Sequence, residues 1–409
     1  MAQYNFIIDS STNTDINRTE AVIGYHFLKE EFEVFDCNIT NKDLEYICLI
    51  CTLGYPSYDI SFPLKKSKYG RLPTPNIDDS LKIPESLLQK YHDGWKISFI
   101  FFTTDESDSP EAPAIFQDYA EYLKINPKHI YISNGNSLLE SRKEFYNSKI
   151  NVNSNVSIPR IMSGVMDRET NHSFTPDREK LFQCYNNMPK QWRFGIYTFF
   201  NKENLLDKVD LSFLGHKKFI EQRPDPPIFN NILDRRVWEE WFEIGINAIN
   251  DKKSLKSEFE TFQFMNNGPQ HNLTYIHNLY KHAYINIVTE TQYNWDGVEH
   301  ITEKSLQPFF FYQIPIIVAT PYHVQSMKDK WGLDFFDDII NHSYDSIDNH
   351  VLRFHKITKE ILRLSKIENE IREFVKNNQD RFEKNKEIIK KIQYTDLDKN
   401  FWRSIKYIK

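Results

Sequence analysis

The stretch from residue 283 to residue 319, AYINIVTETQYNWDGVEHITEKSLQPFFFYQIPIIVA, constrains the fold more than any other part of the chain. Two apolar runs rich in β-branched residues, 283–288 and 314–319, bracket a polar loop and a short aromatic segment. Short apolar runs between turn residues are typical of buried strands, and the segment between these two has the length of a loop and a short helix. The stretch therefore predicts a strand, loop, helix, strand unit.

Glu303 and Lys304 lie in the polar part of this unit, just before the predicted helix. If Thr302 capped the helix, Pro308 would fall six positions in, where proline kinks a helix. A start at Ser305 puts Pro308 in the first turn, where its missing N–H costs nothing. We therefore expect the helix to begin at Ser305. Glu303 and Lys304 would then face a ligand, as a carboxylate and an ammonium able to hold the ribose hydroxyls and the diphosphate of a nucleotide.

A second α/β unit is predicted in the amino-terminal half. Residues 96–102 (KISFIFF) have a strand pattern, 112–123 (APAIFQDYAEYL) a helix pattern and 129–133 (HIYIS) another strand pattern. A strand, a helix and a strand at this spacing indicate a parallel sheet with a right-handed crossover. The apolar run at 46–53 is a further candidate for a buried strand.

Several carboxylates follow the predicted strand at 96–102, in the polar stretch TTDESDSPE. Asp105, Glu106 and Asp108 are placed where an α/β domain presents acid–base groups. The same charges can instead complement the dipole of the helix that follows. Both roles are compatible with the sequence.

The length of 409 residues favours two domains, because single cores usually stop growing below this size. The sequence is polar between residues 140 and 176, where we place the chain's passage from the first domain to the second. The expected division is an amino-terminal domain at 1–165, a carboxyl-terminal domain at 166–355 and a helical tail at 356–409. The long Lys-, Glu- and Ile-rich pattern at 351–392 is the basis for the tail.

The bulk composition narrows the functional classes. A net charge of −6 and a pI near 6.1 lack the basic footprint of a protein held on DNA by non-specific charge. The first residues, MAQYNFIIDSSTNTD, lack the pattern of a signal peptide, and no apolar run has the length of a membrane span. We therefore expect a cytoplasmic protein. The four cysteines do not predict a disulfide scaffold or a zinc site.

Several phosphate-binding and catalytic motifs are absent from the sequence, including G-x-x-x-x-G-K-[ST], G-x-G-x-x-G, H-E-x-x-H and G-x-S-x-G. The D-x-D formed by Asp396 and Asp398 lies in a polar tail and follows no buried strand, so we predict no metal site there. What remains is anion binding by side chains. Arg193 precedes apolar residues at helical spacing, so it should lie near a helix start, where it can bind a phosphate or form a surface ion pair.

These motifs resemble those of two-domain GT-B glycosyltransferases, most closely the α1,3-fucosyltransferase family and related proteins of phages and giant viruses. In that family a strand with an acidic end leads through a loop to Tyr-x-Thr-Glu-Lys, a helix and an Ile-Pro strand. Here ITEK at 301–304 and IPI at 314–316 match, with Glu290 at the acidic position. The segment 187–200, NMPKQWRFGIYTFF, is similar to the family's Asn-Pro and Arg segment. The family's Tyr is His300 here.

The resemblance implies roles for individual residues. Lys304 and Arg193 would bind the diphosphate and Glu303 the ribose. Thr302, Glu290 and His300 complete the implied donor-binding set. By analogy of position, Glu106 or else Asp105 is the candidate catalytic base.

The resemblance also implies a fold and an activity. The fold would be α/β, with two Rossmann-like domains facing across a cleft and the helical tail packing across both. The activity would be inverting, metal-independent transfer of a hexose or pentose from a nucleotide diphosphate sugar, with no other cofactor. A carboxylate would take the proton from an acceptor hydroxyl that attacks the anomeric carbon.

Three versions of the function remain open. The acceptor is a glycan in the first version and a hydroxymethylated base of phage DNA in the second. The second is favoured by a basic cluster in the Pro- and Gly-rich loop at 55–84, formed by Lys65, Lys66, Lys68 and Arg71. In the third version, from another class, the chain is a GT-B-shaped binding protein that no longer transfers sugar.

Overall fold

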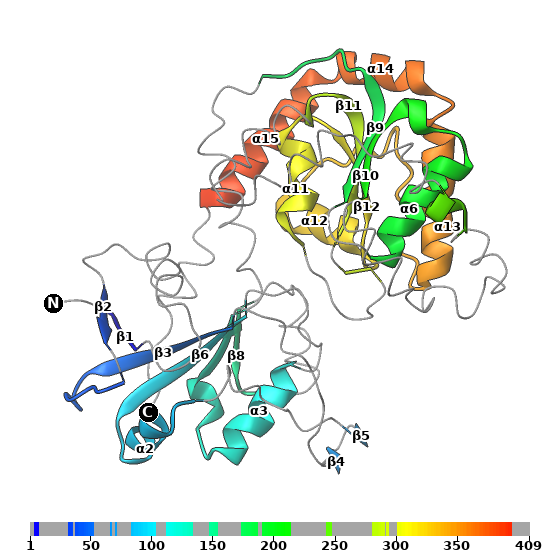
Figure 1. Ribbon diagram of the computed structural model, residues 1–409. Helices are drawn as coiled ribbons and strands as arrows, with labels where there is room; N and C mark the ends of the chain where they lie inside the picture. Colours follow the sequence, from blue (N-terminus) through cyan, green and yellow to red (C-terminus); the bar gives the residue numbers. More distant parts are fainter. Residues whose placement is uncertain are drawn as a thin grey trace. The chain divides into compact units, whose positions relative to one another are not determined.

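The computed structural model describes only part of the chain. The described residues are 4–7, 32–35, 37–52, 66–67, 70–71, 83–103, 112–133, 147–153, 173–186, 190–213, 243–247, 280–290, 292–293 and 301–394. The chain divides into two compact units, one formed mainly by residues 1–160 and the other by residues 161–394 apart from 297–300. Figure 1 shows a parallel sheet with helices in each unit. The predicted α/β class with two Rossmann-like units is confirmed.

The amino-terminal unit is built on a six-stranded sheet of order β2-β1-β3-β6-β7-β8, in which every pairing is parallel. Its strands are β1 (Tyr4–Ile7), β2 (Phe32–Phe35), β3 (Glu45–Thr52), β6 (Lys96–Thr103), β7 (Ile130–Ser133) and β8 (Asn151–Asn153). Its helices are α2 (Glu85–His92), α3 (Ala112–Tyr122) and the 3-10 turn η2 (Pro127–His129). The strands and helix predicted between residues 46 and 133 are confirmed.

The central strands of this sheet are mostly apolar because both of its faces are covered. Phe99 and Ile100 of β6 point to opposite faces, as do Tyr131 and Ile132 of β7, and all four are buried. Parallel strands buried on both faces read as continuous apolar runs, which made them recognisable in the sequence. Within the predicted loop at 55–84, the structure describes a short antiparallel hairpin, β4 (Lys66–Ser67) with β5 (Gly70–Arg71).

The carboxyl-terminal unit is built on a four-stranded parallel sheet of order β10-β9-β11-β12. Its strands are β9 (Lys180–Asn186), β10 (Val209–Phe213), β11 (Ala283–Thr289) and β12 (Ile314–Val318). Its helices are α6 (Gln191–Lys202), α11 (Glu303–Phe310), α12 (His323–Trp331), α13 (His350–Leu364), α14 (Glu368–Asn377) and α15 (Gln379–Tyr394), with a 3-10 turn η3 (Leu206–Lys208). Figure 1 shows α6 and α13 on one side of the sheet and α11 and α15 on the other.

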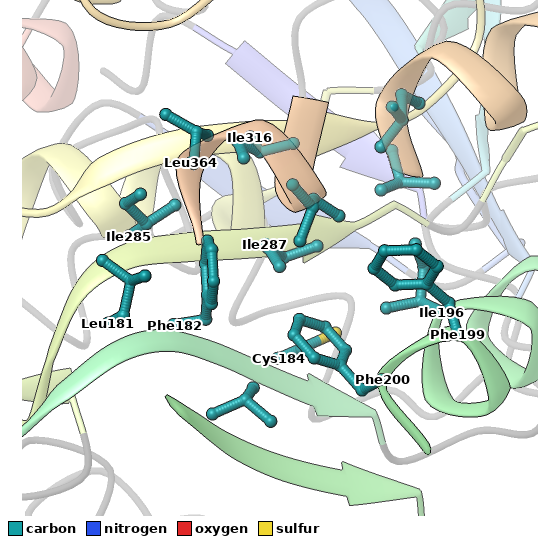
Figure 2. Close-up of a cluster of buried hydrophobic side chains, with 14 of the residues drawn as sticks. Leu181, Phe182, Cys184, Ile196, Phe199, Phe200, Ile285, Ile287, Ile316 and Leu364 are labelled. Carbon is teal, nitrogen blue, oxygen red and sulfur yellow. The ribbon is translucent and has the colours of Figure 1, made fainter. Parts of the chain in front are cut away.

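The predicted strands at 283–288 and 314–319 are confirmed as β11 and β12, which pair in parallel. The long helical pattern at 351–392 is three helices, α13 to α15, and their apolar residues join the core of this unit. Figure 2 shows part of that core, where Leu364 of α13 lies above the strand residues. Most of the expected tail therefore belongs to the carboxyl-terminal unit, while residues 395–409 lie outside the described residues.

A chain of buried amides crosses the centre of this sheet. Gln313, just before β12, donates to Oε1 of Gln183 on β9 at 2.7 Å and accepts from Nδ2 of Asn286 on β11 at 3.0 Å. Both glutamines are fully buried. Burying an amide costs free energy unless it is hydrogen-bonded, so the two hydrogen bonds favour one arrangement of the three strands, while Nε2 of Gln183 finds no partner among the described residues.

A buried arginine ties the amino edge of the same sheet. Arg178 donates to the carbonyl oxygens of Ala283 at 2.8 Å and Tyr312 at 2.7 Å, at the start of β11 and just before the start of β12. Burial lowers the pKa of Arg178 to about 10. The contacts of Arg178 lie at the amino edge of the sheet and do not involve its carboxyl edge.

Candidate functional site

The strand order places a topological switch point at the carboxyl edge of the sheet, between β9 and β11. The connection through α6 leads from β9 to β10 on one side, and the connection through α11 leads from β11 to β12 on the other. At such a switch point the two crossovers diverge, and ligands of open α/β sheets bind there. The N-termini of α6 and α11 both follow strands that end at this point.

The first turn of α6 is tied to the end of β11. Trp192 Nε1 donates to the carbonyl oxygen of Glu290 at 2.9 Å, and Arg193 Nη2 donates to that of Thr289 at 3.1 Å. Arg193 is only 4% exposed. The expected position of Arg193 near a helix start is confirmed, because it is the third residue of α6.

The guanidinium of Arg193 also acts on the end of β9. Burial raises the pKa of the Cys184 thiol to about 12, while a hydrogen bond from Asn186 and the charge of Arg193 oppose this rise. The hydroxyl of Thr289 in turn donates to the side-chain oxygen of Asn186, which joins the ends of β11 and β9. A positive charge therefore lies at the switch point itself.

Glu290 organises the α11 side of the switch point. Its side chain is fully buried, and its carboxylate accepts hydrogen bonds from the backbone N–H of Thr302 at 3.2 Å, from the Thr302 hydroxyl at 2.8 Å and from the Ser305 hydroxyl at 2.5 Å. Hydrogen bonds to an ionised acceptor are the strong ones in proteins. Glu290 thus fixes the N-terminus of α11 to the end of β11.

The prediction that this helix begins at Ser305 is wrong. The helix begins at Glu303, and Thr302 is the N-cap, with its Oγ1 accepting from the Lys304 N–H at 3.2 Å. Pro308 lies inside the helix. The cap is strong because Glu290 orients the Thr302 hydroxyl, and the helix ends two residues after Pro308, so few turns bear the cost of the proline.

This correction moves Lys304 from the loop into the first turn of α11. Its side chain is half-buried, and its backbone N–H is used by the cap. Glu303 is the first helical residue, but its side chain lies outside the described part. The backbone N–H groups at a helix N-terminus attract anions, and a lysine side chain in the first turn adds positive charge. Together they can bind an anion.

His323 belongs to the same cluster and was not predicted. Its Nε2 lies 2.9 Å from the Ser305 hydroxyl, which in turn donates to Glu290. Because the single hydroxyl hydrogen of Ser305 points to the carboxylate, Nε2 of His323 must be the donor. A histidine one strand further along the chain carries no sequence signal for such a contact.

Arg353 was also missed. It lies on α13, is 2% exposed, and donates to the carbonyl oxygens of Ala319 at 3.1 Å and Tyr293 at 2.5 Å. Its guanidinium stacks over the Tyr293 ring at 4.7 Å. Arg353 thereby connects the segment that follows β11 with the segment that follows β12. It does at the carboxyl edge of the sheet what Arg178 does at the amino edge.

The structure brings four of the predicted donor-binding residues to one place, namely Arg193, Glu290, Thr302 and Lys304. His300 and both candidate bases, Glu106 and Asp105, lie outside the described residues. Among the residues that are described, no group of three or more His, Cys, Asp or Glu side chains is arranged to hold a metal ion. No helix of the described part is long and apolar enough to cross a membrane.

No protein-family model and no curated protein sequence matches the chain. Its structural neighbours are GT-B glycosyltransferases. The E. coli trehalose-6-phosphate protein bound with UDP-2-fluoro glucose is 9% identical, with a TM-score of 0.47 over 99% of each chain. An α,α-trehalose-phosphate synthase (UDP-forming) from Burkholderia vietnamiensis is 11% identical, with a TM-score of 0.42 over 78% of this chain and 70% of its own.

T4 phage BGT in complex with its UDP-glucose substrate is a further neighbour. It is 10% identical, with a TM-score of 0.29 over 96% of this chain and 100% of its own. Similarity at this level assigns no substrate and no site residue to the chain.

Proposed function

We propose that the protein is an inverting, metal-independent glycosyltransferase that moves a sugar from a nucleotide diphosphate sugar to an acceptor hydroxyl. One observation carries the proposal. Arg193 and the N-terminus of α11, with Lys304 in its first turn, lie on the two sides of the switch point between β9 and β11. An anionic ligand placed there meets positive charge from both crossovers.

The two cations act on the leaving group. As the bond from the anomeric carbon to the diphosphate breaks, negative charge develops on the diphosphate oxygens. Lys304, Arg193 and the α11 N-terminus stabilise that charge, which is the task a divalent ion performs elsewhere. Glu303, the residue before Lys304, binds the ribose hydroxyls in this proposal.

Glu290 and Thr302 position the site and do not bind the ligand directly. Their hydrogen bonds to each other occupy the buried carboxylate and the cap hydroxyl. A preorganised first turn of α11 needs no rearrangement when the charge develops, which is where electrostatic catalysis gains most. Glu106, or else Asp105, is proposed as the base that takes the acceptor proton.

The test measures ligand-induced stabilisation in the presence of EDTA. A panel of UDP-, GDP- and ADP-sugars is screened by thermal shift, since a ligand that binds only the folded protein stabilises it by about 2.7 kcal/mol at a hundredfold excess over Kd. We expect at least one donor to raise Tm by several degrees. Lys304→Ala should weaken that donor at least tenfold, whereas Lys356→Ala, an exposed lysine on α13, should not.

The proposal fails if no nucleotide sugar shifts the wild type, or if Lys304→Ala binds as well as the wild type does. Turnover of the bound donor separates a transferase from a binding protein that no longer transfers sugar. Acceptor specificity is read with a glycan panel and with duplex DNA containing hydroxymethylated cytosine. Activity on DNA alone, falling steeply with salt, would assign the acceptor to the phage DNA version.

A further inference from the structure

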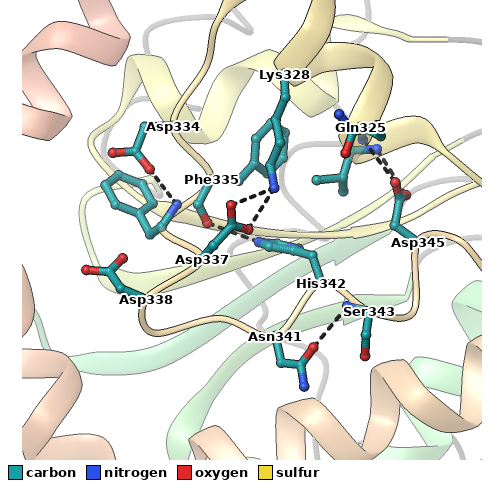
Figure 3. A network of polar contacts seen from close by, with 12 residues as sticks. Gln325, Lys328, Asp334, Phe335, Asp337, Asp338, Asn341, His342, Ser343 and Asp345 are labelled. Carbon is teal, nitrogen blue, oxygen red and sulfur yellow. Dashed lines mark hydrogen bonds and ion pairs between the residues drawn. The ribbon is translucent and has the colours of Figure 1, made fainter.

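A pocket lies next to α12 in the carboxyl-terminal unit. It is a pocket of about 620 Å³ between the start of α12 and the segment 337–346. Figure 3 shows the polar side chains of this region, with Lys328 of α12 facing Asp337 and Gln325 of α12 next to Asp345. Its volume is in the range of pockets that hold small molecules.

The charged groups of the pocket are already neutralised by one another. Lys328 Nζ lies 2.7 Å from both carboxylate oxygens of Asp337 (Figure 3). The Asp345 carboxylate accepts from the backbone N–H groups of Val324 at 3.0 Å and Gln325 at 2.9 Å, so it caps α12. A phosphate would compete with Asp337 and Asp345, and a cation would compete with Lys328 and the helix N-terminus. The pocket therefore favours a ligand without charge.

The groups that remain available are neutral. Within the described part of the chain, the hydroxyls of Tyr322, Ser343 and Ser346 and the amide nitrogen of Asn341 make no hydrogen bond. The Asn341 side-chain oxygen accepts from the Ser343 N–H at 3.0 Å, which turns the amide nitrogen outward from that turn (Figure 3). Hydroxyls and one amide are suited to the hydroxyls of a polyol.

Tyr322 is an unusual residue for its position. Its backbone is left-handed, with φ of 62°, and its side chain is 52% exposed. The backbone is held there because its N–H donates to the Asp345 carbonyl at 2.7 Å and its carbonyl accepts from the Ser326 N–H at 2.9 Å. Glycine or asparagine adopts this conformation more readily. A strained, exposed tyrosine at a pocket mouth indicates that the ring itself is used.

We propose that this pocket binds a neutral saccharide, with one pyranose face packed on the Tyr322 ring and the sugar hydroxyls bonded to Asn341, Ser343 and Ser346. An aromatic ring offers an apolar surface to the C–H face of a sugar and leaves the equatorial hydroxyls for polar neighbours. We expect a nucleobase to bind more weakly. Tyr322 is the one half-exposed aromatic ring among the lining residues, and the other groups without a hydrogen bond are hydroxyls and an amide.

The pocket adjoins the candidate donor site through α12. His323, the residue after Tyr322, points inward to Ser305 and Glu290, whereas Tyr322 and Gln325 line the pocket. The role of the pocket rests on the proposed function, which it deepens by naming a neutral saccharide as the acceptor class. Saccharide binding itself requires no nucleotide, so the two can be tested separately.

The experiment uses saturation-transfer NMR on the full chain without nucleotide. The probes are maltotriose, cellotriose, lactose, chitotriose and methyl α-fucoside, with uridine and adenosine for comparison. We expect at least one saccharide to bind. Tyr322→Gly should weaken it at least tenfold while leaving Tm unchanged or higher, because glycine relieves the backbone strain. Tyr322→Phe should retain most of the affinity, and Tyr122→Ser, at another exposed tyrosine, should retain all of it.

Three outcomes overturn the proposal: no saccharide binds, Tyr322→Gly binds as tightly as the wild type, or nucleosides bind in a Tyr322-dependent manner and saccharides do not. Asn341→Ala provides a second variant, expected to weaken binding severalfold. Thermal shifts with the nucleotide sugar are recorded on the same proteins. Tyr322→Gly should keep that shift and Lys304→Ala should lose it, so a failure of the saccharide pocket is distinguishable from a failure of the donor site.

Discussion

Thr302 donates to the carboxylate of Glu290 from its hydroxyl, which lies 2.8 and 3.0 Å from the two carboxylate oxygens, and from its backbone N–H at 3.2 Å. The two residues are 12 positions apart, one at the end of β11 and one at the cap of α11. A loop that leaves a strand and returns at a helix N-terminus is thereby closed by side chains. The placement of Lys304 depends on this closure.

Glu290→Gln should destabilise the protein by about 2–4 kcal/mol, because hydrogen bonds to a charged acceptor contribute about 1.5–3 kcal/mol each and an amide can replace only part of them. Urea denaturation measures the change. Glu373→Gln is the control, since that carboxylate is 66% exposed and its ion pair with Lys376 is long, at 3.7 Å. Equal stability of the two variants would contradict the role given to Glu290.

Thr302→Val should cost about 1–2 kcal/mol, as expected for loss of an N-cap, and should also weaken nucleotide-sugar binding about tenfold. Valine keeps the shape of threonine but offers neither the acceptor for the Lys304 N–H nor the donor to Glu290. Thr302→Ser retains both and should remain within about 0.5 kcal/mol of the wild type. Binding by calorimetry, together with denaturation, checks the pair. A Val variant that binds normally would show that the cap does not position the ligand.

Lys386→Met should stabilise the protein at pH 7 by about 1 kcal/mol, and the gain should fade at high pH. Lys386 is 5% exposed and lies against the Tyr312 ring at 4.3 Å. Burial and then the neighbouring Lys390 lower its pKa from 10.5 to about 8. The cost of burying the charge, at most about 3 kcal/mol, is partly offset by the hydrogen bond to Tyr312.

The sign of the pH dependence follows from the two pKa values. Below about pH 8 the lysine is charged in both states, so the folded protein bears the full cost. Between pH 8 and 10.5 the unfolded chain keeps the proton that the folded protein releases, so this cost disappears as pH rises. The stability difference between Lys386→Met and wild type, measured at pH 7 and pH 10, should shrink accordingly. A constant difference, or the same trend in exposed Lys366→Met, would refute the assignment.

The strands were predictable from sequence because the sheets are parallel and covered. β6, β11 and β12 are mostly apolar runs, and a run of that kind has few alternatives between turn residues. α6 was predictable for a related reason, since its apolar residues recur at helical spacing. The expected position of Arg193 near the start of α6 was correct, whereas Lys304 lies inside the first turn of α11 and not on the loop before it.

The start of α11 could not be predicted from local rules alone. Proline disfavours a helix interior, but that preference was outweighed by a cap that Glu290 supports from β11. His323 and Arg353 were missed for the same reason, because their partners Ser305, Ala319 and Tyr293 are distant in sequence. Contacts of this kind follow from the closed sheet and leave no periodic pattern.

The amide chain through Gln183, Asn286 and Gln313 has a consequence for how the carboxyl-terminal sheet is assembled. Gln183 and Gln313 are 130 positions apart, and Asn286 and Gln313 are 27 apart. If β12 joined β11 one residue out of register, these side chains would turn to the wrong face, and buried amides would lose their partners. Strands with only apolar side chains could pair in several registers of similar free energy. The three amides distinguish the correct pairing from the others, so the ends of β9 and β11 at the switch point take a single geometry whenever the sheet forms.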